Sequence, residues 1–172
     1  MRHILFILSL TAMTACGGGE TPAEEPKAEE PKAEEPKAEE PKAAEPDLSA
    51  MSDEEKLAAL IKAGEEVYNK GGTAGMACVT CHQANGEGMD PAFPPLKGSK
   101  EEMGDCTQHA KQVIFGQTGK IVVQGKEYDG AMPPLGANTD FEIAAVITYE
   151  RNAWGNDYGV CLPEVVKAAR AK

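Results

Sequence analysis

Hydrophobic side chains recur at helical spacing in two long stretches of this chain. In the first, residues 52–70, leucine, isoleucine, valine and tyrosine repeat every three or four positions, which predicts an amphipathic helix. Ser52 and Glu55 form the S-x-x-E pattern of a capping box at its start, and Gly71-Gly72 predicts its end. The folded part of the chain is therefore expected to begin near Ser52.

The second stretch, 140–154, carries the strongest helical pattern of the chain. Thr139 and Glu142 form another capping box, and the apolar side chains that follow mark one face of a helix. The pair Gly155-Asn156 predicts the end of this helix. Two capped helices are thus predicted, one near the start and one near the end of the folded region.

Shorter elements fill the space between and after these helices. A helix is predicted over 105–115, a small hairpin or extended loop over 119–130, and a last short helix after Pro163. Residues 83–98 are rich in Gly, Asn and Pro and show no helical period, which predicts a long loop. The pattern predicts an all-α fold with four or five short helices and long loops.

The N-terminal residues 1–15 have a different pattern. A basic start at Arg2 precedes an apolar run too short to span a bilayer, which is typical of an export signal. Met13-Thr14-Ala15-Cys16 resembles the lipobox of bacterial lipoproteins, in which Cys16 would carry the lipid. Cleavage at another position, with Cys16 unmodified, is the alternative. We expect a protein on the periplasmic side, lipid-anchored to the inner or the outer membrane.

Residues 16–47 contain four consecutive Glu-Glu-Pro-Lys-Ala repeats. A proline at every fifth position prevents a continuous helix. The repeats contain no apolar residue larger than alanine that could form a core, so this segment is expected to be a solvated linker. The 172-residue chain has a formal net charge of −11, which argues against nucleic acid as a partner. The predicted domains are a signal peptide (1–15), a lipid-anchored acidic linker (16–47) and one folded domain (48–172).

The chemistry of the chain centres on Cys78-Val79-Thr80-Cys81-His82. Two thiols three residues apart followed by a histidine form the attachment pattern of haem c: Cys78 and Cys81 bond to the macrocycle and His82 ligates the iron. The alternatives are a thioredoxin-like redox pair and half of a zinc site. No βαβ pattern and no second close cysteine pair supports either, so one covalent haem c is the predicted cofactor.

A haem iron in a small electron carrier needs a second axial ligand. Most methionines of the chain lie in the signal, at the linker junction or too close to His82, which leaves Met103, His109 and Met132 as candidates. Met132 is the predicted ligand, because the prolines that follow it would hold its thioether rigidly. His109 is otherwise expected to be an ordinary helix-surface or haem-edge residue.

Four further residues have more than one interpretation each. Tyr128 and Trp154 are candidate donors to the haem propionates, or they pack against the macrocycle. Cys106 and Cys161 are left over in an oxidising compartment, which suggests a disulfide; free thiols or intermolecular pairing are the alternatives.

Residues 52–160 resemble the class I, or mitochondrial-type, cytochrome c family. Besides the haem-attachment pattern, the resemblance rests on Phe93-Pro94-Pro95-Leu96, Tyr128-x-Gly130-x-Met132-Pro133 and the helix 140–154. Residues 142–156 also look like the haem domains fused to subunit II of caa3-type oxidases. Those subunits, however, carry membrane-spanning helices and a copper domain that this chain does not show.

The resemblance implies a cytochrome c fold wrapped around one covalently bound haem. It implies that the carbonyl of Pro94 accepts the Nδ1–H of His82, and that Leu96 belongs to the haem pocket. It also implies that the first and last long helices cross at a contact between glycine and aromatic residues. Gly64 and Tyr68 would provide one side of this contact, and Val146 and Tyr149 the other.

The function implied is that of an electron carrier and not an enzyme. Its partners would be redox proteins, with a terminal oxidase and a quinol-oxidising complex as candidates, and no small-molecule substrate is evident. The alternative is a haem peroxidase or the electron-accepting cytochrome subunit of a periplasmic dehydrogenase. A haem-based gas sensor is a third hypothesis, but the chain carries no signalling domain.

Overall fold

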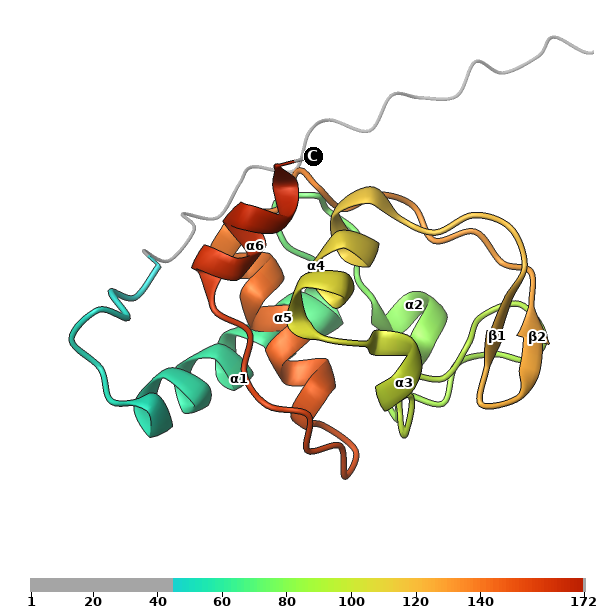
Figure 1. Cartoon of the computed structure of the whole chain (residues 1–172), viewed down its shortest axis with the longest axis horizontal. Coiled ribbons are helices and arrows are strands. Elements are labelled where there is room, and N and C mark those ends of the chain that lie inside the picture. The colour runs from blue at the N-terminus through green and yellow to red at the C-terminus, as the bar shows by residue number, and fades with distance from the viewer. Residues whose placement is uncertain (1–44, 172) are drawn as a thin grey trace, which may run out of the picture. The chain divides into compact units, whose positions relative to one another are not determined.

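The computed structural model describes residues 45–171, and Figure 1 shows their arrangement. Six helices and one two-stranded antiparallel hairpin follow one another along this part of the chain. They are α1 (Asp53–Lys70), α2 (Val79–His82), α3 (Lys100–Met103), α4 (Cys106–Phe115), β1 (Ile121–Val123), β2 (Lys126–Tyr128), α5 (Asp140–Asn152) and α6 (Pro163–Arg170). The predicted all-α class is confirmed, and the predicted signal, the lipidation site at Cys16 and most of the linker lie outside the described residues.

Both predicted capping boxes are present. The Ser52 side chain accepts from the backbone N–H of Glu55, whose carboxylate accepts from the Ser52 N–H, and Thr139 and Glu142 repeat this at the start of α5. Each box satisfies two backbone donors that the first helical turn leaves free. Helix α5 ends at Asn152, two residues before the predicted end, because Trp154 has a φ of 56°.

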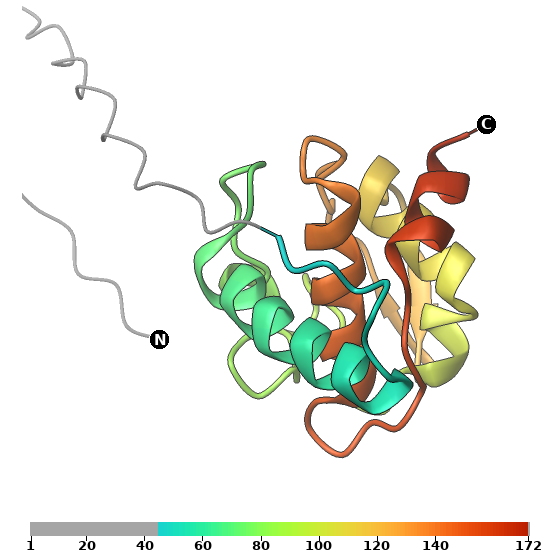
Figure 2. The same cartoon turned by 90° about the vertical axis from the view of Figure 1, so that its left-hand side faces the viewer.

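The long helices α1 and α5 cross at Gly64, and Figure 2 shows α1 running obliquely across α5. A Cβ at Gly64 would overlap the carbonyl group of Ala145 and lie 2.7 Å from the Cβ of Tyr149. The glycine–aromatic crossing is therefore present. The nearest partner beside Tyr149 is Ala145 rather than the expected Val146, which is also buried. Only a residue without a side chain lets the two backbones approach this closely.

Helix α6 packs against α4 and α5. Near its end, the guanidinium of Arg170 donates to the carboxylate of Asp140 (2.6 Å) and to the carbonyls of Gly136 (2.6 Å) and Asn138 (2.5 Å). These bonds tie the last helix to the start of α5. At the other end of the described chain, the carboxylate of Glu45 accepts from the Thr139 hydroxyl at 2.6 Å. This bond joins residue 45, which lies within the predicted linker, to the residue that caps α5.

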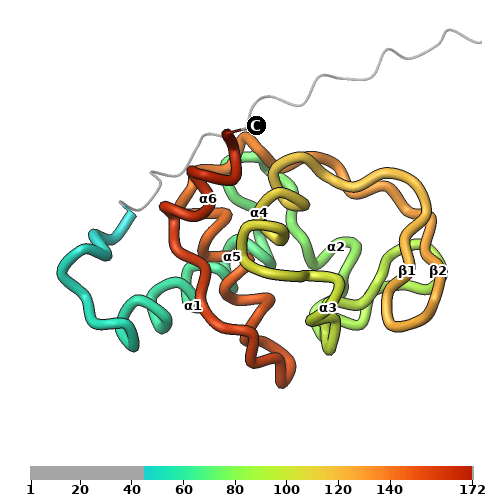
Figure 3. Tube along the Cα trace, viewed as in Figure 1, coloured from blue at the N-terminus to red at the C-terminus, as the bar shows by residue number. Residues whose placement is uncertain are grey.

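Long connections join the helices, as the tube in Figure 3 shows for the segments around α2, α3 and the hairpin. The predicted hairpin is confirmed, with Ile121 opposite Tyr128 and Val123 opposite Lys126. The one-turn helices α2 and α3 were not predicted, because four residues are too few to show a helical period. Within residues 45–171, no helix is both long enough and apolar enough to cross a bilayer.

Candidate haem site

The site is a mainly apolar cavity between α2, α4, the hairpin and the loops that precede α3 and α5. It encloses about 1010 Å³ of empty space, including its open mouth. Most of the lining is apolar, with a few polar groups that converge on the space, which is typical of a cofactor site. Residues predicted to serve the haem line it, namely Cys78, Cys81, His82, Pro94, Leu96 and Met132.

The attachment pattern forms one tight turn. Cys78 caps α2, and its carbonyl accepts from the backbone N–H groups of Cys81 (3.1 Å) and His82 (2.9 Å). This turn brings both cysteines and the histidine to the same cavity wall. At its end, the Tyr68 hydroxyl donates to the carbonyl of Gln83 at 2.6 Å, which fastens the turn to α1.

The imidazole of His82 is held in one tautomer. Its Nδ1 lies 3.0 Å from the carbonyl oxygen of Pro94. A carbonyl can only accept, so Nδ1 carries the proton and Nε2 keeps a free lone pair. His82 is 9% exposed and lines the cavity. A neutral imidazole with a fixed, unprotonated nitrogen is the form that ligates a metal, and such a hydrogen bond raises its basicity.

The loop that carries Met132 is held from two sides. Met132 exchanges two backbone hydrogen bonds with Gln117, of 2.8 and 2.9 Å. A Cβ at Gly130 would overlap the carbonyl oxygen of Ala92 and lie 3.3 Å from the Phe93 ring, so this loop touches the loop that holds Pro94. The structure brings Met132 and His82, fifty residues apart in sequence, to one cavity. Two other methionines, Met76 and Met103, line it as well.

The two other interpretations of the cysteine pair disagree with the geometry. Burial, and next the neighbouring carboxylate of Glu150, raise the pKa of the Cys78 thiol. A thioredoxin-like cysteine needs a lowered pKa, because the thiolate is the reactive form. In the described part of the chain, no group of three or more His, Cys, Asp or Glu side chains could hold a metal ion. Two unpaired thiols facing an apolar cavity instead suit covalent attachment of a macrocycle.

Tyr128 and Trp154 differ from the other predicted pocket residues. Tyr128 is buried in β2 and does not itself line the cavity, although its strand partner Ile121 does. The indole N–H of Trp154 donates to the carbonyl of Ala84 at 2.9 Å, and its ring packs 5.3 Å from that of Tyr68. The indole donor thus already has a partner, and Trp154 packs on Tyr68 without lining the cavity, so the structure supports neither the propionate interpretation nor packing against the macrocycle.

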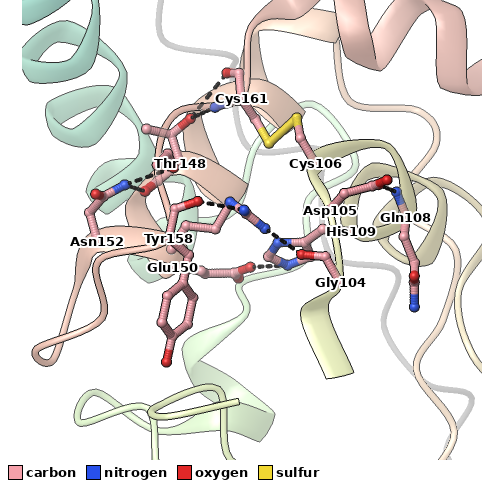
Figure 4. The surroundings of a disulfide bond; sticks show 12 residues. Gly104, Asp105, Cys106, Gln108, His109, Thr148, Glu150, Asn152, Tyr158 and Cys161 are labelled. Atoms are coloured by element: carbon pink, nitrogen blue, oxygen red, sulfur yellow. Dashed lines mark hydrogen bonds and ion pairs between the residues drawn. A yellow bond between two sulfur atoms is a disulfide. The ribbon is translucent and has the colours of Figure 1, made fainter. Parts of the chain in front are cut away.

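His109 is a buried residue and not a helix-surface one. Figure 4 shows it beside Glu150. It is 4% exposed, lines the cavity, and its Nε2 lies 3.0 Å from a carboxylate oxygen of the equally buried Glu150. Sequence reasoning missed Glu150. A signal was present, since Glu150 follows Ile143 and Ile147 at helical spacing and thus falls on the buried face of α5.

Cys106 and Cys161 form a disulfide, with their Cα atoms 5.5 Å apart (Figure 4). It links the start of α4 to the segment between α5 and α6. Beside it, the Thr148 hydroxyl donates to the carbonyl of Cys161 and accepts from its N–H. The disulfide therefore fastens α4, which carries His109, to a segment that is hydrogen-bonded to α5, which carries Glu150.

An all-α fold, a cavity walled by apolar side chains and a Cys-x-x-Cys-His turn with a free imidazole nitrogen define a c-type haem protein. The residues present fit this group: Cys78 and Cys81 would hold the macrocycle, and His82 would meet its iron. A family model for cytochrome c matches residues 61–154, and the chain belongs to this family. Members of the family bind haem c covalently and carry electrons.

Individual relatives agree with this assignment. Cytochrome c-552 of Thermus thermophilus is 38% identical over 104 residues, which span 55% of this chain and 79% of the relative. The cytochrome c-552 of a further Thermus thermophilus strain is equally similar, with 70% of its length covered. The cytochrome c subunit of a quinone alcohol dehydrogenase from Gluconobacter oxydans is 33% identical over 98 residues, which cover 19% of that protein.

Proposed function

We propose that this chain is a class I monohaem cytochrome that shuttles electrons between respiratory proteins, with His82 and Met132 as axial ligands. The observation that carries this proposal is the shared cavity, which receives a fixed imidazole nitrogen from one loop and a thioether from another. Haem supplies a one-electron couple when bound. Histidine and methionine ligation raises the reduction potential and leaves no open position for a substrate.

The axial ligand is tested on the holoprotein by substitution. Met132→Ala should remove the far-red methionine–iron band of the ferric spectrum and lower the midpoint potential. Met89→Leu is the matched control, because Met89 is exposed and lies outside the cavity wall. Loss of the band in Met103→Leu rather than in Met132→Ala would reassign the ligand. High-spin features in the wild type would favour the peroxidase alternative.

The N-terminal segments are proposed to tether this carrier. In our proposal, residues 1–15 direct export, Cys16 carries the lipid, and 16–47 form an acidic linker on the periplasmic side of a membrane. A stretched proline-rich chain extends about 3 Å per residue, so the repeat-bearing part of the linker, residues 20–47, reaches roughly 80–90 Å. Such a tether raises the effective concentration of the haem domain near membrane partners. Support comes from the lipobox pattern and the repeat.

Mass spectrometry of the mature protein tests the anchor. We expect a lipid-modified N-terminal Cys16 and partition into a detergent phase, both lost in Cys16→Ser. A mature protein that begins elsewhere, with an unmodified Cys16, would contradict the anchor. Separation of inner and outer membranes then locates the wild-type protein.

Two kinds of partner are supported by different observations. The likeness of residues 142–156 to oxidase-linked haem domains favours a terminal oxidase as acceptor and a quinol-oxidising complex as donor. The Gluconobacter relative favours the second candidate, a cytochrome subunit that accepts electrons from a dehydrogenase. Purification from native membranes separates them: a carrier elutes alone and restores oxidase turnover to stripped membranes, whereas a subunit elutes with its dehydrogenase in fixed ratio.

A further inference from the structure

The wall of the haem cavity contains a buried acid–base pair. His109, on α4, is 4% exposed and Glu150, on α5, is 3% exposed, and their Nε2 and Oε2 atoms lie 3.0 Å apart. Figure 4 shows the two side chains pointing toward each other. Both residues line the cavity that also contains Cys78, His82 and Met132. The electron carrier function described above does not use this pair.

The pair can bind or release one proton without breaking its own hydrogen bond. An ionised carboxylate only accepts, so Nε2 of His109 is the donor, and Nδ1 is buried with no hydrogen-bond partner. With a neutral imidazole the pair has a net charge of −1. One added proton, on Nδ1 or on the carboxyl group, makes it neutral. Because the two groups interact closely, this proton belongs to the pair.

The other groups that face Glu150 do not replace it as a proton site near neutral pH. Burial, and next Glu150, raise the pKa of Tyr68 on α1, and burial also raises that of Tyr149 on α5, so both phenols stay protonated. The Cys78 thiol, within hydrogen-bonding reach of Glu150, is the atom that the haem would alkylate. Glu150 therefore lies beside a predicted attachment point.

The charged neighbours of the pair have partners of their own. Arg151 donates to the carbonyls of Gly104 (3.2 Å) and Tyr158 (2.5 Å), and burial lowers its pKa, against the opposing effect of the Asp105 carboxylate. Glu102, the other carboxylate in the cavity wall, accepts from the backbone N–H of Gln124 at 2.7 Å and is partly exposed. Arg151 and Glu102 thus differ from the His109–Glu150 pair. In the pair both side chains are deeply buried, and Nδ1 of His109 has no hydrogen-bond partner and can bind a proton.

We infer that the His109–Glu150 pair is a proton-binding site coupled to electron transfer at the haem. As one electron arrives from the donor protein and the iron goes from ferric to ferrous, the pair takes one proton from water. It returns this proton when the electron leaves for the acceptor, so the charge of the cavity stays constant. The coupling is electrostatic: charges in one low-dielectric cavity interact more strongly than in water. The inference rests on the proposed attachment of haem at Cys78 and His82.

Redox titrations of the holoprotein between pH 5 and 8 test this coupling, since histidine ordinarily changes charge in that range. For the wild type we expect the equilibrium constant of reduction to fall by up to tenfold per pH unit, which is 59 mV for one electron. In His109→Leu/Glu150→Leu this dependence should disappear. Replacing both partners by apolar groups avoids leaving one buried charge behind, so the variant is expected to fold.

The matched control is Glu127→Gln, because Glu127 forms an ion pair with Lys120 that is solvent-exposed. It should keep the wild-type pH dependence. A flat wild-type profile, or an unchanged slope in the double variant, would overturn the inference and assign any dependence to the propionates.

Proton uptake by the wild type provides a second readout that requires no variant. On reduction in weakly buffered solution, a pH indicator should report uptake approaching one proton per electron near the steepest part of the profile. No uptake anywhere in the range would contradict the inference. Failure of the haem-site assignment itself looks different: the purified protein would then lack the covalent haem spectrum altogether.

Discussion

The crossing of α1 and α5 provides a sharp test of how this fold holds its site. In Gly64→Ala, the added methyl group would overlap the carbonyl of Ala145 and lie 2.7 Å from the Cβ of Tyr149, where ordinary contacts measure 3.4–4 Å. Neither obstacle is the far end of a flexible side chain. The two helices must therefore separate by about 1 Å to restore normal contact distances.

The size of the effect follows from two opposing contributions. Overpacking of this kind costs roughly 1–3 kcal/mol, and the rigid neighbours favour the upper end of that range. Alanine is a better helix former than glycine by about 1 kcal/mol, which offsets part of the cost. We expect a net loss near 2 kcal/mol, which lowers Tm by roughly 6–10 °C in a domain of this size.

Thermal unfolding of the ferric holoprotein, followed by far-UV circular dichroism and haem absorbance, measures this loss. Ala58→Gly is the matched control, because Ala58 is exposed within the same helix and reports the helix-propensity difference alone. It should cost about 1 kcal/mol. A Gly64→Ala protein as stable as the wild type would refute the close-approach argument.

Two further predictions concern stability. Cys106→Ala/Cys161→Ala opens a loop that the disulfide closes across a sequence separation of 55 residues. The free energy of unfolding should fall by about 4 kcal/mol by the chain-entropy estimate. Denaturant titration without reductant measures this loss, and an unchanged midpoint would contradict it. Glu142→Ala removes the carboxylate that accepts from the Thr139 N–H at 2.8 Å and from the N–H and hydroxyl of Thr73 at 3.1 Å. The free energy of unfolding should fall by about 2–3 kcal/mol. Hydrogen exchange should then rise first at the start of α5, and uniform exchange would argue against a local role.

Local chemistry decided what could be predicted from the sequence. The starts of α1 and α5 were predictable because the side chains of Ser52 and Thr139 satisfy backbone donors of the first turn. The haem-attachment motif was recognisable for a similar reason, since Cys78, Cys81 and His82 are neighbours in sequence and the carbonyl of Cys78 bonds to the other two within one turn. Membership of the cytochrome c family follows from such local motifs, and the family model confirms it.

Packing between distant segments decided the features that the sequence did not predict, such as the end of α5 and the contacts at the helix crossing. The spacing of α5 suggested that its helix reaches Trp154, but the indole N–H bonds to Ala84, seventy residues earlier, and the helix stops short of it. The expected crossing of Gly64 with Tyr149 is present, but the atom nearest to Gly64 is the backbone carbonyl oxygen of Ala145, which was not named in that expectation. A helical period shows which residues share a face, whereas the crossing geometry depends on the partner helix.

The sequence alone predicted that this chain holds a haem through Cys78, Cys81 and His82, because attachment needs only neighbouring residues. Only the tertiary structure decided what surrounds that haem. His109 and Glu150 lie 41 positions apart, and the packing of α4 against α5 turns a helix-face histidine and an unnoticed acid into one buried pair. Burial and pairing are properties of the assembled cavity, so no local pattern could have revealed the pair itself.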